Sequence, residues 1–266
     1  MVGGRRVSCA RRPAHRRRRK YHGDAAMTIG TRNLELDTPD GTMPTYEATP
    51  DGMARGGVVV VQEAFGVTRH IERICERLAT AGWTAIAPAL FHRQGSPVFA
   101  YDTDFSEIRQ VMGGLGREGL TVDLAAAFDH LVSAGFSGRR RGIIGFCMGG
   151  AVSLFAGTEH DLGAAVTFYG GGVREGRFGL PSLIELAPSL KTPWFGAYGD
   201  RDSGIAVDDV EALRVAASRA VVETEIVRYA DAEHGFNCDD RPAVYNPEAA
   251  ADAWARALAF FDAHLA

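Results

Sequence analysis

Three residues with side chains suited to nucleophilic catalysis occur in a suggestive order along the chain: Cys147, then Asp202, then His234. Cys147 lies in the hexapeptide Gly145–Gly150, which reads G-F-C-M-G-G. This pattern predicts a strand, a sharp turn carrying the nucleophile, and a helix, and glycines flank the turn because it leaves no room for side chains. The N-terminus of that helix would favour a thiolate. A buried structural cysteine on a glycine-rich turn would have the same sequence pattern. The choice between the two interpretations therefore depends on whether the chain also supplies a base and an acid.

The two downstream residues supply what a cysteine nucleophile needs. A thiol requires a base to become a thiolate at neutral pH, and His234 can serve. The histidine requires a carboxylate that fixes its tautomer and stabilises its charged form. Asp200 and Asp202 are both available after Gly199, and their side chains cannot both face the histidine. We prefer Asp202, three residues after this glycine.

A third segment, Gln62–Gly66, follows the apolar run Gly57–Val61 and contains Glu63. The oxyanion formed at an attacked carbonyl needs two backbone donors. The amide of Met148, directly after the cysteine, is one candidate. The amide of Ala64, in the turn after this strand, is the other. The alternative interpretation of Glu63 is an ion pair or a capping role at a strand end.

The surrounding sequence alternates between strand and helix patterns. Apolar β-branched or aromatic runs predict buried strands, and apolar residues at the 3.6-residue period predict helices between them. The expected strands are 33–36, 43–49, 57–61, 83–87, 142–145, 164–169, 192–198 and 223–229. Such alternation indicates an α/β fold with a mostly parallel central sheet and helices on both faces. Ligands of these sheets bind at the carboxyl ends of the strands, where Glu63, Cys147, Asp202 and His234 all fall.

Composition limits the classes of protein that remain. With 266 residues, 46% hydrophobic and 23% charged, the chain is typical of a globular protein with a sizeable core. We expect residues 27–266 to form one domain. No apolar run approaches the ~20 residues of a membrane helix, so we expect no membrane association. Oligomeric state is left open between a monomer and a small homo-oligomer.

The first 26 residues differ sharply from the rest. They hold nine Lys/Arg and one acid, whereas the remainder holds 20 Lys/Arg against 32 Asp/Glu, a net charge near −12. We expect residues 1–26 to be a disordered basic extension. It is a solvated tail, a nucleic-acid-binding arm or, as we favour, upstream sequence translated from a start codon placed ahead of Met27. The acidic body argues against a nucleic-acid partner.

The four cysteines show neither a C-x-x-C pair nor metal-ligand spacing with histidine. We therefore expect no disulfide framework, no metal and no organic cofactor. A nucleophilic cysteine needs a reducing compartment, which favours a cytoplasmic location.

Taken together, these motifs resemble the dienelactone hydrolase family (carboxymethylenebutenolidases), which has the α/β-hydrolase fold without a large cap domain. The resemblance runs from about residue 28 to the C-terminus. It is carried by Gln62–Gly66, Gly145–Gly150, Gly199–Asp202 and Ala232–Phe236. The first two motifs together are specific, whereas either alone is only moderately so.

The resemblance implies a role for each matching residue. The family triad of Cys, Asp and His maps to Cys147, Asp202 and His234, and the family glutamate that contacts the resting thiol maps to Glu63. Arg93, in Phe91-His92-Arg93-Gln94, matches an arginine that holds the substrate carboxylate. A guanidinium fork suits this task, although Arg93 could also be an ordinary surface residue.

One departure limits the substrate assignment. Family members specialised for dienelactone carry a second arginine four residues after the histidine, where this chain has Cys238. Arg241 is three residues further on, and its relation to the site stays open. We expect a hydrolase that opens an ester or lactone, with a carboxylated dienelactone-type substrate favoured. The alternatives are a general carboxylesterase or thioesterase on the same fold, and a non-hydrolytic binding or redox-sensing protein built on a reactive thiol.

Overall fold

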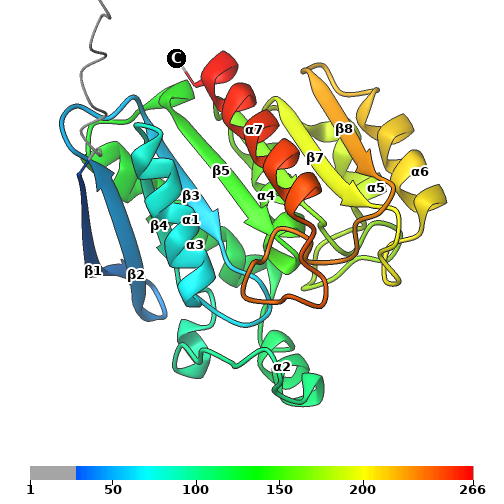
Figure 1. Ribbon diagram of the computed structural model, residues 1–266. Helices are drawn as coiled ribbons and strands as arrows, with labels where there is room; N and C mark the ends of the chain where they lie inside the picture. The colour runs from blue at the N-terminus through cyan, green and yellow to red at the C-terminus, as the bar shows by residue number, and fades with distance from the viewer. Residues whose placement is uncertain (1–27, 266) are drawn as a thin grey trace, which may run out of the picture.

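The computed structural model describes residues 28–265, so the predicted extension over residues 1–26 lies outside the described residues. The described chain forms an eight-stranded sheet, and its strands are β1 Ile29–Thr38, β2 Gly41–Pro50, β3 Gly57–Val61, β4 Thr84–Pro88, β5 Arg141–Phe146, β6 Ala164–Phe168, β7 Trp194–Gly199 and β8 Thr224–Tyr229. Their order across the sheet is β1-β2-β4-β3-β5-β6-β7-β8 (Figure 1).

Parallel pairing joins β4, β3, β5, β6, β7 and β8, whereas β1 and β2 pair antiparallel at one edge. Every residue of β3 is buried, as its unbroken run of apolar side chains predicts for a strand covered on both faces. β5 lies directly beside β3, with Val61 opposite Gly145. This pairing sets the predicted elbow next to the segment that contains Glu63.

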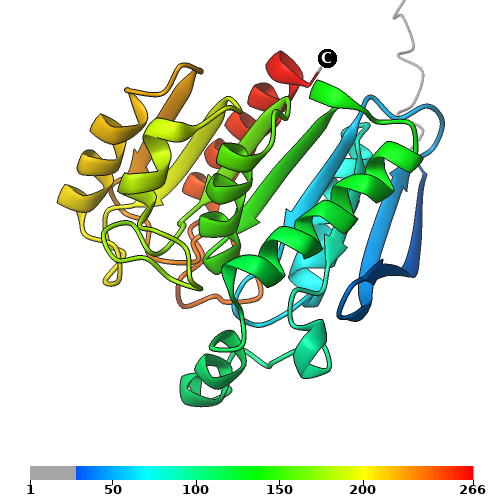
Figure 2. The same ribbon diagram turned by 180° about the vertical axis from the view of Figure 1, so that it is seen from behind.

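Helices cover both faces of the sheet, and their bounds are α1 Arg69–Thr80, α2 Phe105–Met112, α3 Arg117–Ser133, α4 Met148–Glu159, α5 Leu183–Leu186, α6 Val207–Ala217 and α7 Pro247–His264. Figure 1 shows α1 and α7 in front of the sheet, and Figure 2 shows α3, α4 and α6 behind it. Each face has its own apolar core cluster, as the two layers of helices require. Three short 3₁₀ segments are His92–Gln94, Gly138–Arg140 and Ala187–Ser189.

The antiparallel edge is the predicted hairpin, with Asp40–Gly41 at its turn. Glu47 on β2 is only 3% exposed and is paired with Arg32 on β1 and with His130 on α3, at 2.9 Å from His130 Nε2. Arg32 and His130 both hydrogen-bond this carboxylate, which would otherwise be costly to bury. The hairpin is thereby tied to a helix far along the chain.

The observed architecture confirms the predicted α/β-hydrolase fold, and no large cap is visible over the described residues. α2 projects at the end of the sheet where β3 and β5 terminate, but it spans only Phe105–Met112 (Figure 1). Among the described helices, none combines the length and apolar character needed to cross a membrane.

Candidate active site

The turn between β5 and α4 places Cys147 in an unusual backbone conformation. Its φ is 56° and its ψ is −116°, a positive φ that a non-glycine residue seldom adopts. The amide of Cys147 donates to the carbonyl of Phe168 at 3.1 Å, and its carbonyl accepts from Gly150 at 3.0 Å. These bonds hold a strained residue at the start of a helix, where the side chain is only half-buried.

The glycines around Cys147 are required by close backbone contacts. A Cβ on Gly145 would lie 1.8 Å from the carbonyl oxygen of Gly149. A Cβ on Gly149 would lie 2.4 Å from the carbonyl oxygen of Val61 on the neighbouring strand. The elbow therefore forms only because both positions lack side chains, which is the steric reason inferred from the sequence.

His234 and Asp202 are directly paired. The Nδ1 of His234 lies 2.6 Å from Oδ2 of Asp202, whose side chain is 1% exposed. The other carboxylate oxygen, Oδ1, accepts from the Gly204 amide at 2.8 Å. With Nδ1 engaged, Nε2 is the ring nitrogen available to Cys147.

The neighbouring Asp200 is engaged elsewhere. Its two oxygens accept from Nε and Nη2 of Arg228 at 2.7 and 2.8 Å. Hydrogen bonding to Arg228 lowers the pKa of Asp200. Of the two aspartates, Asp202 is the one that His234 contacts, and Asp200 is paired with Arg228.

The electrostatic surroundings of His234 favour its charged form. Burial disfavours the imidazolium, but the charge of the Cys147 thiolate and the hydrogen bonds to Asp202 and Cys147 outweigh this effect. The pKa of His234 is therefore raised well above its usual range. A cysteine and histidine coupled in this way can exist as a thiolate–imidazolium pair.

Glu63 lies at the end of β3 and is 1% exposed. Its Oε1 accepts from the hydroxyl of Tyr169 at 3.1 Å, whereas Oε2 is buried without a hydrogen-bond partner among residues 28–265. Burial, then the nearby charge of Glu63, raise the pKa of Tyr169 far above normal. No hydrogen bond joins Glu63 and Cys147 within residues 28–265.

The two predicted oxyanion donors lie just after β5 and β3, which are neighbours in the sheet. Met148 is the first residue of α4, where a backbone N–H has no partner within the helix. The amide of Ala64 donates no backbone hydrogen bond within the described residues, and the Ala64 side chain is 1% exposed.

Cys147, Met148, Asp202 and His234 line one cavity of about 280 Å³. Its remaining walls come from α2, from the loop after β6 and from the loop after β7, and they are Phe105, Met112, Gly171, Arg177, Phe178, Ser203, Gly204 and Ile205. The residues with apolar side chains outnumber the charged ones, as is usual in a pocket for a small organic molecule.

Arg93 lies elsewhere, and its predicted role as the carboxylate anchor has to be revised on this geometry. Its Nε and Nη2 donate to Asp40 at 2.9 and 2.7 Å, and its Nη1 and Nη2 donate to Asp123 at 2.8 and 2.9 Å. Asp123 is fully buried. A guanidinium already shared between two carboxylates has little left to offer a substrate, and Arg93 does not line the cavity.

Arg241 and Cys238 do not line the cavity either. The guanidinium of Arg241 stacks over the rings of Phe65 and Tyr101, at 5.4 and 5.9 Å from their centroids. Cys238 is buried, and its Sγ lies 3.4 Å from the hydroxyl of Tyr101. Arg241 therefore packs beside the segment after β3 and is not directed into the space above Cys147.

Arg177 is a cavity residue that the sequence interpretation missed. It lies in the loop after β6, and among the described residues it forms no ion pair. The available signal was its position: it follows a parallel strand, and its loop therefore starts at the same edge of the sheet as the elbow.

No group of three or more potential metal ligands occurs within residues 28–265.

Comparisons with known proteins agree with this arrangement. Relatives named "Putative carboxymethylenebutenolidase" include one from Salmonella typhimurium, 38% identical over 90% of this chain and 88% of the relative. Another, from Escherichia coli strain K12, is 39% identical over 82% of each. A crystal structure of a "Putative Dienelactone Hydrolase" from Klebsiella pneumoniae superposes with a TM-score of 0.79 at 36% identity, covering 88% of this chain and 99% of that one.

The match is also found at the level of the family as a whole. The model of the dienelactone hydrolase family aligns with residues 43–265, which include both specific motifs and all the residues of the cavity. A match of this extent leaves little of the described chain outside the family pattern. The chain belongs to the dienelactone hydrolase family.

Proposed function

We propose that this enzyme, a hydrolase of the dienelactone hydrolase type that acts on esters or lactones, works through Cys147, His234 and Asp202. One observation carries the proposal: the 2.6 Å His234–Asp202 pair lines the same cavity as a cysteine on a strained turn at a helix N-terminus. A binding or redox-sensing protein would need the thiol but not the paired histidine and aspartate.

In the first half of the reaction, the Cys147 thiolate attacks the carbonyl carbon of the substrate. The oxyanion is stabilised by the amides of Ala64 and Met148. The carbon–oxygen bond to the leaving group then breaks, and the departing enolate or alkoxide takes the proton of the His234 imidazolium. The product of this half is a thioester on Cys147. Glu63, with one oxygen unpartnered among the described residues, is available to accept the proton of a resting thiol.

In the second half, His234 acts as a base toward water. Formation of the thioester removes the negative charge of Cys147, which is one of the influences that raise the pKa of His234. The pKa of His234 therefore falls once the enzyme is acylated, and the neutral imidazole can take a proton from water. Hydroxide attack on the thioester releases the carboxylic acid, which ionises in solution, and restores the Cys147 thiolate beside the His234 imidazolium.

For the carboxylated substrate favoured by the sequence, we propose Arg177 as the anchoring residue in place of Arg93. Arg177 lines the cavity and has no carboxylate partner within residues 28–265, so its planar fork is available to a substrate carboxylate. A general carboxylesterase or thioesterase would not depend on this residue. The requirement for a thiolate keeps a reducing, cytoplasmic location as our prediction.

The decisive experiment is to trap and locate the acyl group. With p-nitrophenyl acetate, the wild type should show a burst of p-nitrophenol and a transient mass increase on the peptide that contains Cys147. Cys147→Ala should lose at least about 10⁴-fold in kcat/KM. Cys75→Ala, which removes a buried thiol outside the cavity, is the matched control and should remain active. Hydrolysis that survives in Cys147→Ala would contradict the assignment of the nucleophile.

A further inference from the structure

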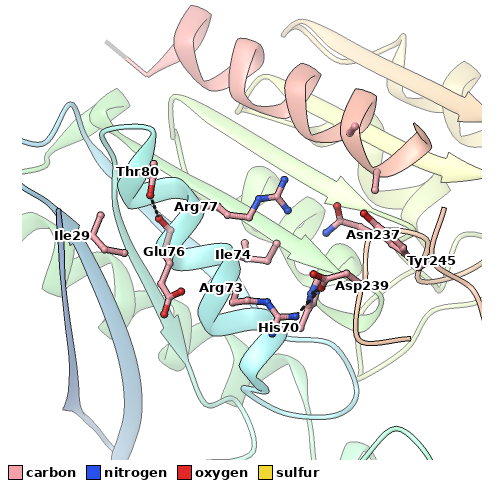
Figure 3. A pocket seen from close by; sticks show the side chains of 12 residues that line it. Ile29, His70, Arg73, Ile74, Glu76, Arg77, Thr80, Asn237, Asp239 and Tyr245 are labelled. Atoms are coloured by element: carbon pink, nitrogen blue, oxygen red, sulfur yellow. Dashed lines mark hydrogen bonds and ion pairs between the residues drawn. The ribbon is translucent and has the colours of Figure 1, made fainter. Parts of the chain in front are cut away.

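A second and larger cavity, of about 500 Å³, lies between α1, the start of α7 and the segment that follows His234. It shares no lining residue with the cavity above Cys147. Figure 3 shows that α1 supplies most of its charged side chains and that the loop after His234 supplies Asn237 and Asp239. The volume is within the range of pockets that bind small molecules.

Most charged groups of this cavity are already paired with one another. Arg73 contacts Asp239 and Asp240, each at 2.8 Å. Glu76 is paired with Arg69 at 2.7 Å and accepts from the hydroxyl of Tyr46 at 2.9 Å. Carboxylates outnumber cations in these pairs, because Arg73 contacts two aspartates and Arg69 contacts Glu72 as well as Glu76. These groups therefore leave no cation free for an anionic ligand.

Arg77 is the exception. Its guanidinium carbon lies 3.9 Å from the ring centroid of Trp254. The guanidinium group forms no hydrogen bond or ion pair with any of residues 28–265. The stacking fixes the plane of the guanidinium while leaving its N–H donors free. Arg77 is exposed, so these donors are open to solvent and to a ligand.

Asn237 provides a second unused polar group. The residue is 2% exposed, and neither its amide nitrogen nor its amide oxygen has a hydrogen-bond partner within the described residues. In Figure 3, Asn237 and Arg77 point toward each other across the cavity. Buried amides are nearly always hydrogen-bonded in proteins, so an unpartnered one that lines a cavity indicates a missing ligand.

We propose that this cavity is a binding site for a small-molecule carboxylate, held by the guanidinium of Arg77 and the amide of Asn237. The planar fork of an arginine matches the two oxygens of a carboxylate. A single unpaired cation, with Asp239 and Glu76 close by, is poorly suited to a phosphate dianion. Ile74 and Ala250 line the same space, so the ligand carries an apolar body.

The first test measures binding of 4-fluorobenzoate to the full-length wild-type chain by ¹⁹F NMR and calorimetry. We expect a dissociation constant of about 1 mM or tighter. The neutral isostere 4-fluorobenzamide should bind at least tenfold more weakly. Equal binding of the two compounds, or no binding of 4-fluorobenzoate at about 10 mM, would overturn the proposal.

Variants then locate the site. Arg77→Gln should weaken 4-fluorobenzoate binding at least tenfold and leave ester hydrolysis without the ligand within about twofold of wild type. Arg55→Gln is the matched control, because Arg55 also stacks on a tryptophan, Trp83 at 4.2 Å, but is paired with Asp262 and does not line the cavity. Its affinity should be unchanged.

Two further variants test where the ligand binds and whether Asn237 helps to hold it. Arg177→Ala, in the cavity above Cys147, should bind 4-fluorobenzoate as wild type does, and loss of binding there would place the ligand in the active site and overturn the proposal. Asn237→Leu removes a buried unpartnered amide, so it should keep or increase the thermal stability while it weakens binding. If Arg77→Gln does not fold, Asn237→Leu still tests the proposal, because unchanged affinity for 4-fluorobenzoate in that variant would contradict it.

Discussion

At the scale of the single residue, the chemistry depends on how Cys147 and His234 influence each other. Their coupling raises the pKa of His234, although burial alone would lower it. Cys147 is therefore as much a part of the histidine's environment as Asp202 is. A site of this kind responds to a change in either member through the protonation of the other.

This coupling predicts the effect of removing the thiolate. In Cys147→Ala, the pKa of His234 should fall, because the charge and the hydrogen bond of Cys147 both raise it in the wild type. The ¹⁵N shifts of the His234 ring should then report a protonated imidazole at about pH 7.5 in the wild type and a neutral one in the variant. Identical titration in both proteins would show that the two side chains are not coupled.

Arg177 and Arg93 lead to opposite predictions at the same scale. Arg177→Ala should lower kcat/KM for a carboxylated lactone about 10- to 100-fold, with little change for uncharged p-nitrophenyl esters. Arg93→Ala should reduce the free energy of unfolding by about 3 kcal/mol, because it leaves Asp123 buried without its arginine. Steady-state kinetics and denaturant unfolding on both variants separate binding from stability. A selective loss of lactone activity in Arg93→Ala would restore the role first expected for it.

At the scale of the element, the elbow is a contact between three backbone segments as much as a turn. Gly149 lies against the end of β3, and Gly150 lies against Gly170 after β6. The position of the nucleophile is therefore set by how closely α4 approaches its neighbouring strands. Close backbone packing of this kind tolerates no added methyl group unless a strand moves.

Gly145→Ala should accordingly destabilise the fold by about 3 kcal/mol or more, because the new Cβ would lie 1.8 Å from a carbonyl oxygen. Gly116→Ala is the matched control: no atom lies within 4 Å of its added Cβ, and the change should stay within about 0.5 kcal/mol. Urea unfolding curves measure both. Wild-type stability in Gly145→Ala would mean that the turn can relax without the glycine.

The predictable part of the site is the part encoded in short segments. Cys147, Asp202 and His234 each follow a strand, and the parallel arrangement brings such positions together without further information. The pairing of Arg93 with Asp123 was not predictable, because it joins two segments thirty residues apart through a buried contact. Arg177 was missed for a similar reason, since its long loop after β6 carries no periodic pattern that fixes where its side chains point.

At the scale of the whole molecule, the described sheet has an open, antiparallel edge at β1 and β2. A buried carboxylate connects this edge to α3. Glu47 joins β1, β2 and α3 through Arg32 and His130. Burial acts to raise the pKa of Glu47, but the hydrogen bonds to Arg32 and His130 outweigh it, and the net pKa is lowered. A carboxylate whose pKa is lower in the folded state stabilises the fold above its unfolded pKa.

Stability at this edge should therefore depend on pH in a definite direction. The contribution of Glu47 is present above about pH 4.5 and is lost as the pH falls through its lowered folded-state value. Glu47→Gln should cost about 1–3 kcal/mol of unfolding free energy at about pH 7 and progressively less in acid. Thermal unfolding of both proteins from about pH 7 to about pH 3 measures the difference. A constant difference over that range would contradict the ionic role of Glu47.

The strands that support the site also set the order in which it is completed during synthesis. The elbow follows β5, and His234 follows β8, roughly ninety residues later. At about 5–20 residues per second, Cys147 is translated several seconds before the histidine that it is paired with in the folded chain. During that interval the nascent thiol has neither His234 nor Asp202 beside it, although β3, the strand next to the elbow, is already translated. The proposed pairing of Cys147 with His234 can therefore form only after the last strand of the sheet has been translated.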